Sequence, residues 1–352
     1  MMKPRLAMQR RRRPLIARTL LAVGLAAAHL SLGPAYGENI GAISVGAGED
    51  VVTLASEHVR VGVSANIGRI VDFAPVDGDN LLWLNADERG KPVPPPRSSF
   101  RDVRRAYRNH GGDKVWPTVQ AFWERAFGGA GWPPDGVIDG QPWQIVEQSA
   151  HHLVIRSQVH PVLGVHCERE LRLDADQPTA RITNRLTRVQ PSIFPVNIWT
   201  ITQVRHPRFA LLDIAAERAQ PASWIDFGNG DKLEGSVRLH DADDAAAALQ
   251  WTFDHEAPAK LGTLGHWIAG VWDDRVFLQT IDDYDPTAAY PDGSNVQAYA
   301  NGDYLELELL SPLVHLQPGE SLAHTVTWRL LPRDDATAAA LIDVLRSHAA
   351  GE

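Results

Sequence analysis

Strict alternation of apolar and charged residues near the end of the chain constrains the fold more than any other feature. Leu305, Leu307 and Leu309 alternate with Glu306 and Glu308. Because successive side chains of a β-strand point to opposite faces of the sheet, this spacing predicts a strand with a leucine face toward the core and a glutamate face away from it. A solvated surface is one interpretation of the glutamate face. The other is a concave pocket, in which a fixed carboxylate is suited to act as a general base.

Short strands predominate in the rest of the chain. After a turn at Pro318 and Gly319, alternation resumes at residues 324–330 and predicts a hairpin with the leucine-glutamate strand. Period-two patterns also occur at residues 51–63, 69–73, 143–147, 153–159, 167–173 and 180–187. Helical patterns are confined to residues 99–108 and 335–348, the second preceded by acids and rich in alanine and leucine. We therefore expect an all-β, antiparallel sandwich with a short C-terminal helix.

The first residues resemble an export signal. Four arginines at residues 10–13 precede a mostly apolar stretch at residues 15–32, and small residues follow at 35–37. This order predicts a signal peptide over residues 1–37 and a single domain over residues 38–352, which would be periplasmic or secreted. A retained membrane anchor is the alternative, but Arg18 and His29 interrupt the apolar run.

Charge and cysteine content exclude several classes of function. The formal net charge is −9, and removing residues 1–37, with seven basic and no acidic residues, takes it to −16. An acidic chain of this kind is a poor partner for nucleic acid or an anionic membrane. Cys167 is the only cysteine, so no intramolecular disulfide can form and no cysteine-rich metal site is expected. No phosphate-binding glycine motif occurs either, so we expect no cofactor.

A polar segment with paired glycines is the first candidate site. Gly111 and Gly112 permit a tight turn, and His110, Asp113 and Lys114 surround it. Trp116 follows, and an indole face can cover the apolar side of a sugar ring while polar groups bind its hydroxyls. The simpler alternative is a surface turn in which Asp113 and Lys114 only pair with each other.

Two further segments carry aromatic and polar residues together. One is a proline-rich loop that holds Trp132 and Asp135. The other is an expected strand at residues 195–203, whose alternation places Asn197, Trp199 and Gln203 on one face. Amide groups beside a stacking ring suit hydroxyl recognition, although buried amides satisfied by the neighbouring backbone would produce the same pattern.

These motifs, taken in order, resemble the galactose mutarotase-like superfamily. The resemblance runs from about residue 51 to residue 330. It includes Gly111–Gly112 with Trp116–Pro117, the expected strands at residues 169–173 and 182–186, and the final leucine-glutamate strand. It implies a β-supersandwich with a sugar-binding concave face, and it places the catalytic glutamate on Glu308 with Glu306 beside it.

The resemblance also reveals a departure. Enzymes of that superfamily have a histidine on a middle strand as general acid, and the matching stretch at residues 197–203 has none. His110, His166 and His206 are possible substitutes, with His110 our choice. Five arginines between residues 97 and 108 run into the first segment, and they favour an anionic sugar if they line the pocket rather than a solvated helix face.

Three hypotheses follow from the sequence. The chain is an exported carbohydrate-binding protein that acts on the anomeric centre of an aldose with Glu308 as base, a non-catalytic carbohydrate-binding module that stacks sugars on Trp116, Trp132 and Trp199, or a polysaccharide lyase or hydrolase. In the last case both glutamates would approach from one side of the sugar, which suits a glycosidase poorly. The expected partner is a sugar or oligosaccharide, and the sequence does not specify an oligomeric state.

Overall fold

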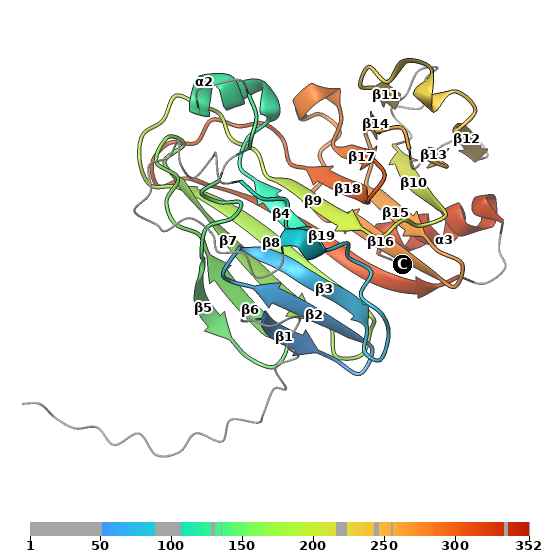
Figure 1. The fold of residues 1–352 in the computed structure, drawn as a ribbon, viewed down its shortest axis with the longest axis horizontal. Helices are drawn as coiled ribbons and strands as arrows, with labels where there is room; N and C mark the ends of the chain where they lie inside the picture. The colour runs from blue at the N-terminus through green and yellow to red at the C-terminus, as the bar shows by residue number, and fades with distance from the viewer. Residues whose placement is uncertain are drawn as a thin grey trace, which may run out of the picture. The chain divides into compact units, whose positions relative to one another are not determined.

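The computed structural model describes residues 51–88, 107–127, 131–134, 136–215, 224–242, 246–254, 256–333 and 337–351 (Figure 1). The predicted signal peptide and most of the predicted helix at residues 99–108 lie outside this part of the chain. Within it, all paired strands are antiparallel and build two sheets, as the period-two patterns predict.

One sheet has nine strands among the described residues. Their order is β1 (Val51–Ala55), β2 (Val59–Ser64), β3 (Arg69–Pro75), β4 (Asp113–Trp116), β9 (Trp199–Val204), β18 (Leu305–Leu310), β17 (Val296–Ala300), β14 (Ala259–Thr263) and β11 (Trp224–Asp226).

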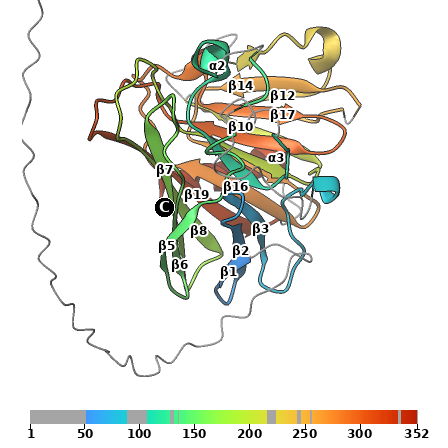
Figure 2. The same cartoon turned by 60° about the vertical axis from the view of Figure 1, so that its left-hand side comes forward.

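The second sheet has ten strands within the same part of the chain. Their order is β12 (Val237–Ala242), β13 (Ala246–Trp251), β10 (Phe209–Ile214), β15 (Trp267–Val271), β16 (Arg275–Ile281), β19 (Ser321–Pro332), β8 (Thr179–Arg188), β7 (Val165–Leu173), β6 (His152–Arg156) and β5 (Gln144–Gln148). In Figure 2, β5–β8 form a layer separate from β1–β3 of the first sheet.

The hydrophobic core lies between the two sheets. Leu305, Leu307 and Leu309 are fully buried in it, which confirms the predicted leucine face of β18. Phe73 of β3 contacts Phe277 of β16, with 4.9 Å between ring centroids, and Trp328 of β19, with 5.0 Å. The other face of β18, which carries Glu306 and Glu308, therefore points away from this core.

Helices contribute little to the described structure. The α-helices are α2 (Trp123–Phe127) and α3 (Ala338–Ala350), and the 3₁₀ turns are η1 (Ala86–Glu88), η2 (Gln120–Phe122), η4 (Gly230–Leu233) and η5 (Pro291–Gly293). The predicted C-terminal helix is confirmed as α3, although Thr337, not an acid, caps it by accepting a hydrogen bond from the backbone N–H of Ala340. None of these helices in the described residues is long and apolar enough to cross a membrane.

Three predicted elements differ from the structure. The hairpin of residues 305–330 is wrong, because β18 and β19 belong to different sheets and the segment between them crosses from one to the other. The predicted strand at residues 51–63 is two strands, since the chain turns at Ser56 and Glu57. The strand expected at residues 195–203 begins only at Trp199.

Candidate functional site

A cavity of about 640 Å³ opens on the face of the nine-stranded sheet that points away from the core. Strands β4, β9, β14, β17 and β18 form its floor, and aromatic side chains dominate its wall. The lining residues are Tyr107, Asn109, Lys114, Trp116, Gln120, Trp132, Trp199, Phe227, Asn229, Pro258, Ala259, Lys260, Tyr299, Tyr304, Glu306 and Glu308. Aromatic walls with a few charged groups at the floor are typical of small-molecule sites.

The strand register brings the charged residues together. Lys260 lies opposite Tyr299, Tyr299 lies opposite Glu306, and Glu306 lies opposite Gln203, so four adjacent strands form one row. Directly opposed side chains on a sheet face are within contact distance. The cavity floor is thus assembled from segments that are far apart in the sequence.

Glu308 is the most buried carboxylate at this floor, with 1% of its surface exposed. One oxygen, Oε2, accepts hydrogen bonds from Lys260 Nζ at 2.7 Å and from Trp199 Nε1 at 2.8 Å. Burial raises the pKa of Glu308 because the charged form loses solvation, and the nearby positive charge of Lys260 only partly opposes this. A carboxylate with a raised pKa and a direct proton donor beside it is suited to proton transfer.

A second carboxylate and ammonium pair lies next to the first. Glu306 Oε1 accepts from Gln203 Nε2 at 2.9 Å and lies 3.4 Å from Lys114 Nζ. Each lysine also lies over an indole ring, Lys114 at 4.9 Å from the centroid of Trp116 and Lys260 at 4.7 Å from that of Trp199. Both lysines are therefore held in place by a carboxylate and an aromatic face.

A buried loop carboxylate fixes the orientation of Trp116. Its Nε1 donates to Asp139 Oδ2 at 2.7 Å, and Asp139 Oδ1 accepts from Arg69 Nε at 3.0 Å. The ring of Trp116 also makes an edge contact with Trp199, with centroids 5.0 Å apart. The two indoles are consequently rigid, which lowers the entropy cost of stacking a ligand on them.

Six of the residues predicted from the sequence line this cavity: Lys114, Trp116, Trp132, Trp199, Glu306 and Glu308. Trp132 is 56% exposed and lies at the cavity edge, in contact with Tyr107. Asp135 lies outside the described residues.

Four other predicted residues do not line the cavity. Asp113 and Lys114 are not presented together by a turn, because they are adjacent in β4 and so point to opposite faces. Asp113 faces the core, where it pairs with Arg169 and accepts from Thr202 Oγ1 at 2.8 Å. Gln203 is not among the residues that line the cavity, but its Nε2 donates a hydrogen bond to Glu306 Oε1, which lies at the cavity floor.

Neither Asn197 nor His110 contributes to the cavity lining. Asn197 is fully buried, precedes the first residue of β9 and is absent from the cavity lining. His110 is also buried, and its pKa is lowered to about 4, mainly because burial disfavours the charged imidazolium. In the structure the substitute general acid proposed from the sequence is therefore a buried residue away from Glu308.

Lys260, Tyr299 and Tyr304 line the cavity but were not identified from the sequence. Lys260 and Tyr299 each occupy the non-core position of a short alternating strand, which is the signal that could have revealed them. The alternation alone does not give the order of the strands in the sheet, so it does not show that these residues lie beside Glu306 and Glu308. Across the described residues, no cluster of histidine, cysteine, aspartate or glutamate side chains could hold a metal ion.

Comparison with known proteins identifies the fold. A family model described as a domain of unknown function (DUF4380) matches residues 50–331. No curated protein matches the chain. Among solved structures, a putative aldose 1-epimerase from Escherichia coli K12 is similar with a TM-score of 0.50 at 14% identity, over 81% of this chain and 100% of that one.

Two further solved structures are similar to this chain over most of its length. A galactose mutarotase-like protein from Lactobacillus casei ATCC 334 has a TM-score of 0.51 at 9% identity, over 80% of this chain and 100% of that one. A putative mutarotase from Salmonella typhimurium has a TM-score of 0.50 at 11% identity, over 81% of this chain and 92% of that one. The predicted galactose mutarotase-like fold is thus confirmed, and at these identities the likeness concerns fold alone.

Proposed function

The chain belongs to the DUF4380 family, and we propose that its aromatic cavity binds a sugar and interconverts the anomers of an aldose, with Glu308 as the base. The observation that carries this proposal is the buried Glu308 carboxylate, in direct contact with Lys260 at the floor of the cavity. The names of the similar solved structures, a putative aldose 1-epimerase, a putative mutarotase and a galactose mutarotase-like protein, support the same chemistry.

Sugar recognition is supported by the composition of the cavity wall. Trp132 is 56% exposed and offers a flat face for the C–H side of a sugar ring, while Trp116 and Trp199 line the cavity beside Lys114 and Lys260. Glu306 is positioned to accept hydrogen bonds from sugar hydroxyl groups. A volume of about 640 Å³ can hold a monosaccharide with room for a second residue toward Trp132.

Anomer interconversion needs a base at the anomeric hydroxyl and an acid at the ring oxygen. In the proposed mechanism, Glu308 takes the proton of the anomeric hydroxyl while Lys260 gives a proton to the ring oxygen, and the bond from the anomeric carbon to that oxygen breaks. After rotation of the aldehyde, the reverse steps close the ring in the other configuration. Ring closure returns one proton to Lys260 and takes one from Glu308, so both groups regain their starting states, and the 2.7 Å contact between Lys260 Nζ and Glu308 Oε2 holds the acid beside the base.

This assignment removes the need for the absent histidine. A lysine ammonium is a weaker acid than an imidazolium, so we expect modest rates. The signal peptide predicted from the sequence supports our proposal that the protein acts in the periplasm or outside the cell.

The test is the rate of mutarotation of freshly dissolved aldoses, followed by polarimetry or NMR. We expect Glu308→Gln to lower the rate by about 10²–10⁴-fold while calorimetric sugar binding persists, and Lys260→Met to lower it as well. Glu57→Gln, which alters an exposed carboxylate between β1 and β2, serves as control and should retain the full rate. Binding without acceleration by the unmodified protein would instead identify a non-catalytic carbohydrate-binding module.

A further inference from the structure

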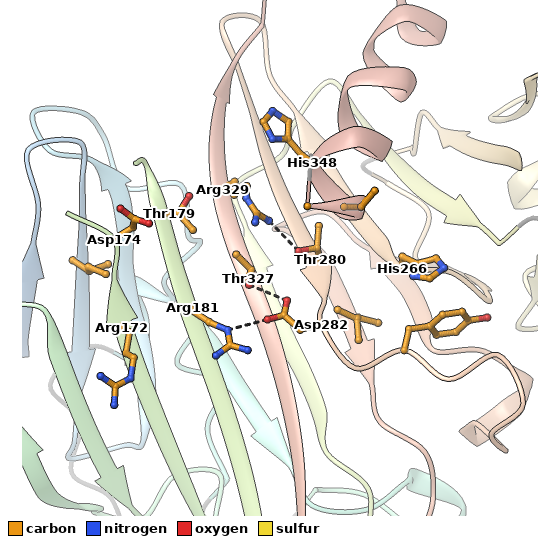
Figure 3. A pocket seen from close by; sticks show the side chains of 16 residues that line it. Arg172, Asp174, Thr179, Arg181, His266, Thr280, Asp282, Thr327, Arg329 and His348 are labelled. Atoms are coloured by element: carbon orange, nitrogen blue, oxygen red, sulfur yellow. Dashed lines mark hydrogen bonds and ion pairs between the residues drawn. The ribbon is translucent and has the colours of Figure 1, made fainter. Parts of the chain in front are cut away.

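A second cavity, of about 690 Å³, lies on the outer face of the ten-stranded sheet, beside the C-terminal end of α3. Figure 3 shows Arg172, Arg181 and Arg329 along this face, with His348 of α3 above Arg329. Another part of the same outer face is covered by α3, through Leu341, which packs against strands β10, β15 and β16. The cavity is therefore distinct from the proposed sugar site, which is on the other sheet.

Two of the three arginines already have carboxylate partners. Arg181 Nε lies 2.9 Å from Asp282 Oδ2, a contact drawn in Figure 3. Arg172 Nε donates to Glu170 Oε1 at 2.6 Å. Both side chains are also largely exposed, so solvent stabilises them further.

Arg329 differs from both. Its Nη1 donates to the hydroxyl oxygen of Thr280 at 3.1 Å, and among the described residues no carboxylate lies within ion-pair distance of its guanidinium. The side chain is partly buried, and burial lowers its pKa because the charge loses solvation, with Asp282 only partly opposing this. A guanidinium has five N–H donors in a planar fork, so most of its capacity is unused here.

Hydroxyl and imidazole donors lie near this charge, and the carboxylates of Asp174 and Asp282 also line the cavity. Thr179 is the direct cross-strand neighbour of Arg329, and both line the cavity with His348. Burial, followed by the charge of Arg329, lowers the pKa of His348, and a ring N–H of this imidazole is a hydrogen-bond donor. The negative end of the α3 dipole offsets part of the Arg329 charge, but that effect is typically below 1 kcal/mol at an exposed helix end.

We propose that this outer cavity binds an oxyanion group, a carboxylate, sulfate or phosphate carried by a ligand, with Arg329 as the principal contact and Thr179 and His348 as supporting donors. An oxyanion would accept two parallel hydrogen bonds from the free edge of the guanidinium. It would also place a negative charge in direct contact with the guanidinium, whereas Asp174 and Asp282 line the cavity beyond ion-pair distance of it. This inference does not depend on the proposed sugar reaction, because no residue is shared between the two cavities.

The test is calorimetry and thermal unfolding with sodium phosphate, sodium sulfate and sodium glucuronate at constant ionic strength, with sodium chloride as reference. We expect at least one of the three to bind saturably and raise the Tm. Arg329→Gln should weaken that binding at least tenfold, and Arg329→Lys, which keeps the charge but loses the fork, should weaken it less. The relative affinities distinguish a carboxylate from a sulfate or phosphate ligand.

Arg208→Gln is the control, because Arg208 is exposed, pairs with Asp273 and lies outside this cavity. It should leave anion binding unchanged. The proposal is overturned if none of the three anions binds more strongly than chloride. It is equally overturned if Arg329→Gln lowers the Tm but leaves anion binding intact, since Arg329 would then only stabilise the end of α3.

Discussion

At the residue scale, burial shifts the titration of Glu308 and His110 in opposite directions. Both side chains are buried, and loss of solvation disfavours the charged form of each. For Glu308 the charged form is the deprotonated one, so the pKa rises, and Lys260 remains close enough to exchange a proton with it. For His110 the charged form is protonated, so the pKa falls. The raised pKa of Glu308 suits a base, whereas the lowered pKa of His110 favours its neutral imidazole.

His110 should therefore make stability depend on pH. Its native pKa is lowered to about 4 from 6.5, first by burial and then by the charge of Arg69. An unfolded chain takes up a proton as the pH falls through 6.5, while the native protein resists until about 4. We expect the contribution of His110 to the free energy of unfolding to fall over that interval, whereas Glu308, whose pKa is raised, contributes in the opposite direction because the native state takes up its proton first.

Urea unfolding of the unmodified protein and of His110→Gln, measured from pH 7 to pH 4, isolates this contribution. The difference in unfolding free energy between the two proteins should shift in favour of the variant as the pH decreases. An NMR titration of the ring should show a midpoint well below 6.5. A midpoint near 6.5 would show that His110 is solvated in the native state and would contradict the buried placement.

At the scale of elements, the sequence predicts which face of a strand a side chain occupies better than it predicts which strands are adjacent in the sheet. The alternation around Glu308 determines which side chains share a face, because the period of a strand is fixed by the backbone. The partnership of Glu308 with Lys260 depends on β14, β17 and β18 being adjacent, and nothing in the local pattern specifies that order. The hairpin prediction was wrong for the same reason. A proline-glycine turn fits a change of sheet as well as a hairpin.

The paired glycines before β4 were predicted to form a tight turn, and both have positive φ, 84° at Gly111 and 71° at Gly112. A β-carbon at Gly112 would lie 2.3 Å from the carbonyl oxygen of Ile70, which is backbone and cannot move aside easily. The turn lets β4 begin beside β3 and so directs Lys114 and Trp116 into the cavity. Both glycines are thus needed for the position of the site.

We expect Gly112→Ala to reduce the free energy of unfolding by clearly more than the roughly 1–2 kcal/mol that a left-handed conformation costs. Gly131→Ala is the matched control, since Gly131 has a similar φ of 75° but nothing within 4 Å of an added β-carbon. Urea denaturation of both variants measures the difference. Equal losses in the two proteins would show that the backbone around Ile70 adjusts, and that close packing at Gly112 is unimportant.

At the scale of the whole described unit, the sandwich class follows from the short alternating strands, but the polar contacts inside it do not. From the sequence, Asp113 was predicted to lie at a polar turn of the sugar site, and Arg169 only to belong to an alternating strand. In the structure both are buried between the sheets, Arg169 from β7 and Asp113 from β4. A burial this complete depends on two strands of different sheets facing each other, which is a property of the assembled fold. The domain boundary at residue 38 and the export of the chain stay predictions.

Thr202 of β9 extends this contact. Its hydroxyl donates to Asp113 Oδ2 at 2.8 Å and accepts from Gln279 Nε2 of β16 at 2.9 Å. A buried ion pair with its hydrogen bonds satisfied is not necessarily more stable than an apolar contact of the same shape, but removing one partner leaves a buried charge. Replacing one partner of the Arg169–Asp113 pair should therefore reduce the free energy of unfolding more than replacing both.

We expect Asp113→Asn to reduce the free energy of unfolding by about 3–5 kcal/mol, because Arg169 keeps a buried charge without a counterion. The double variant Asp113→Asn with Arg169→Met should lose less than Asp113→Asn alone, since the charge itself is gone. Asp273→Asn, which breaks the exposed pair with Arg208, should change stability by less than about 1 kcal/mol. Urea denaturation at pH 7 measures all three, and a double variant less stable than Asp113→Asn would show that Arg169 stabilises the two sheets through contacts other than this ion pair.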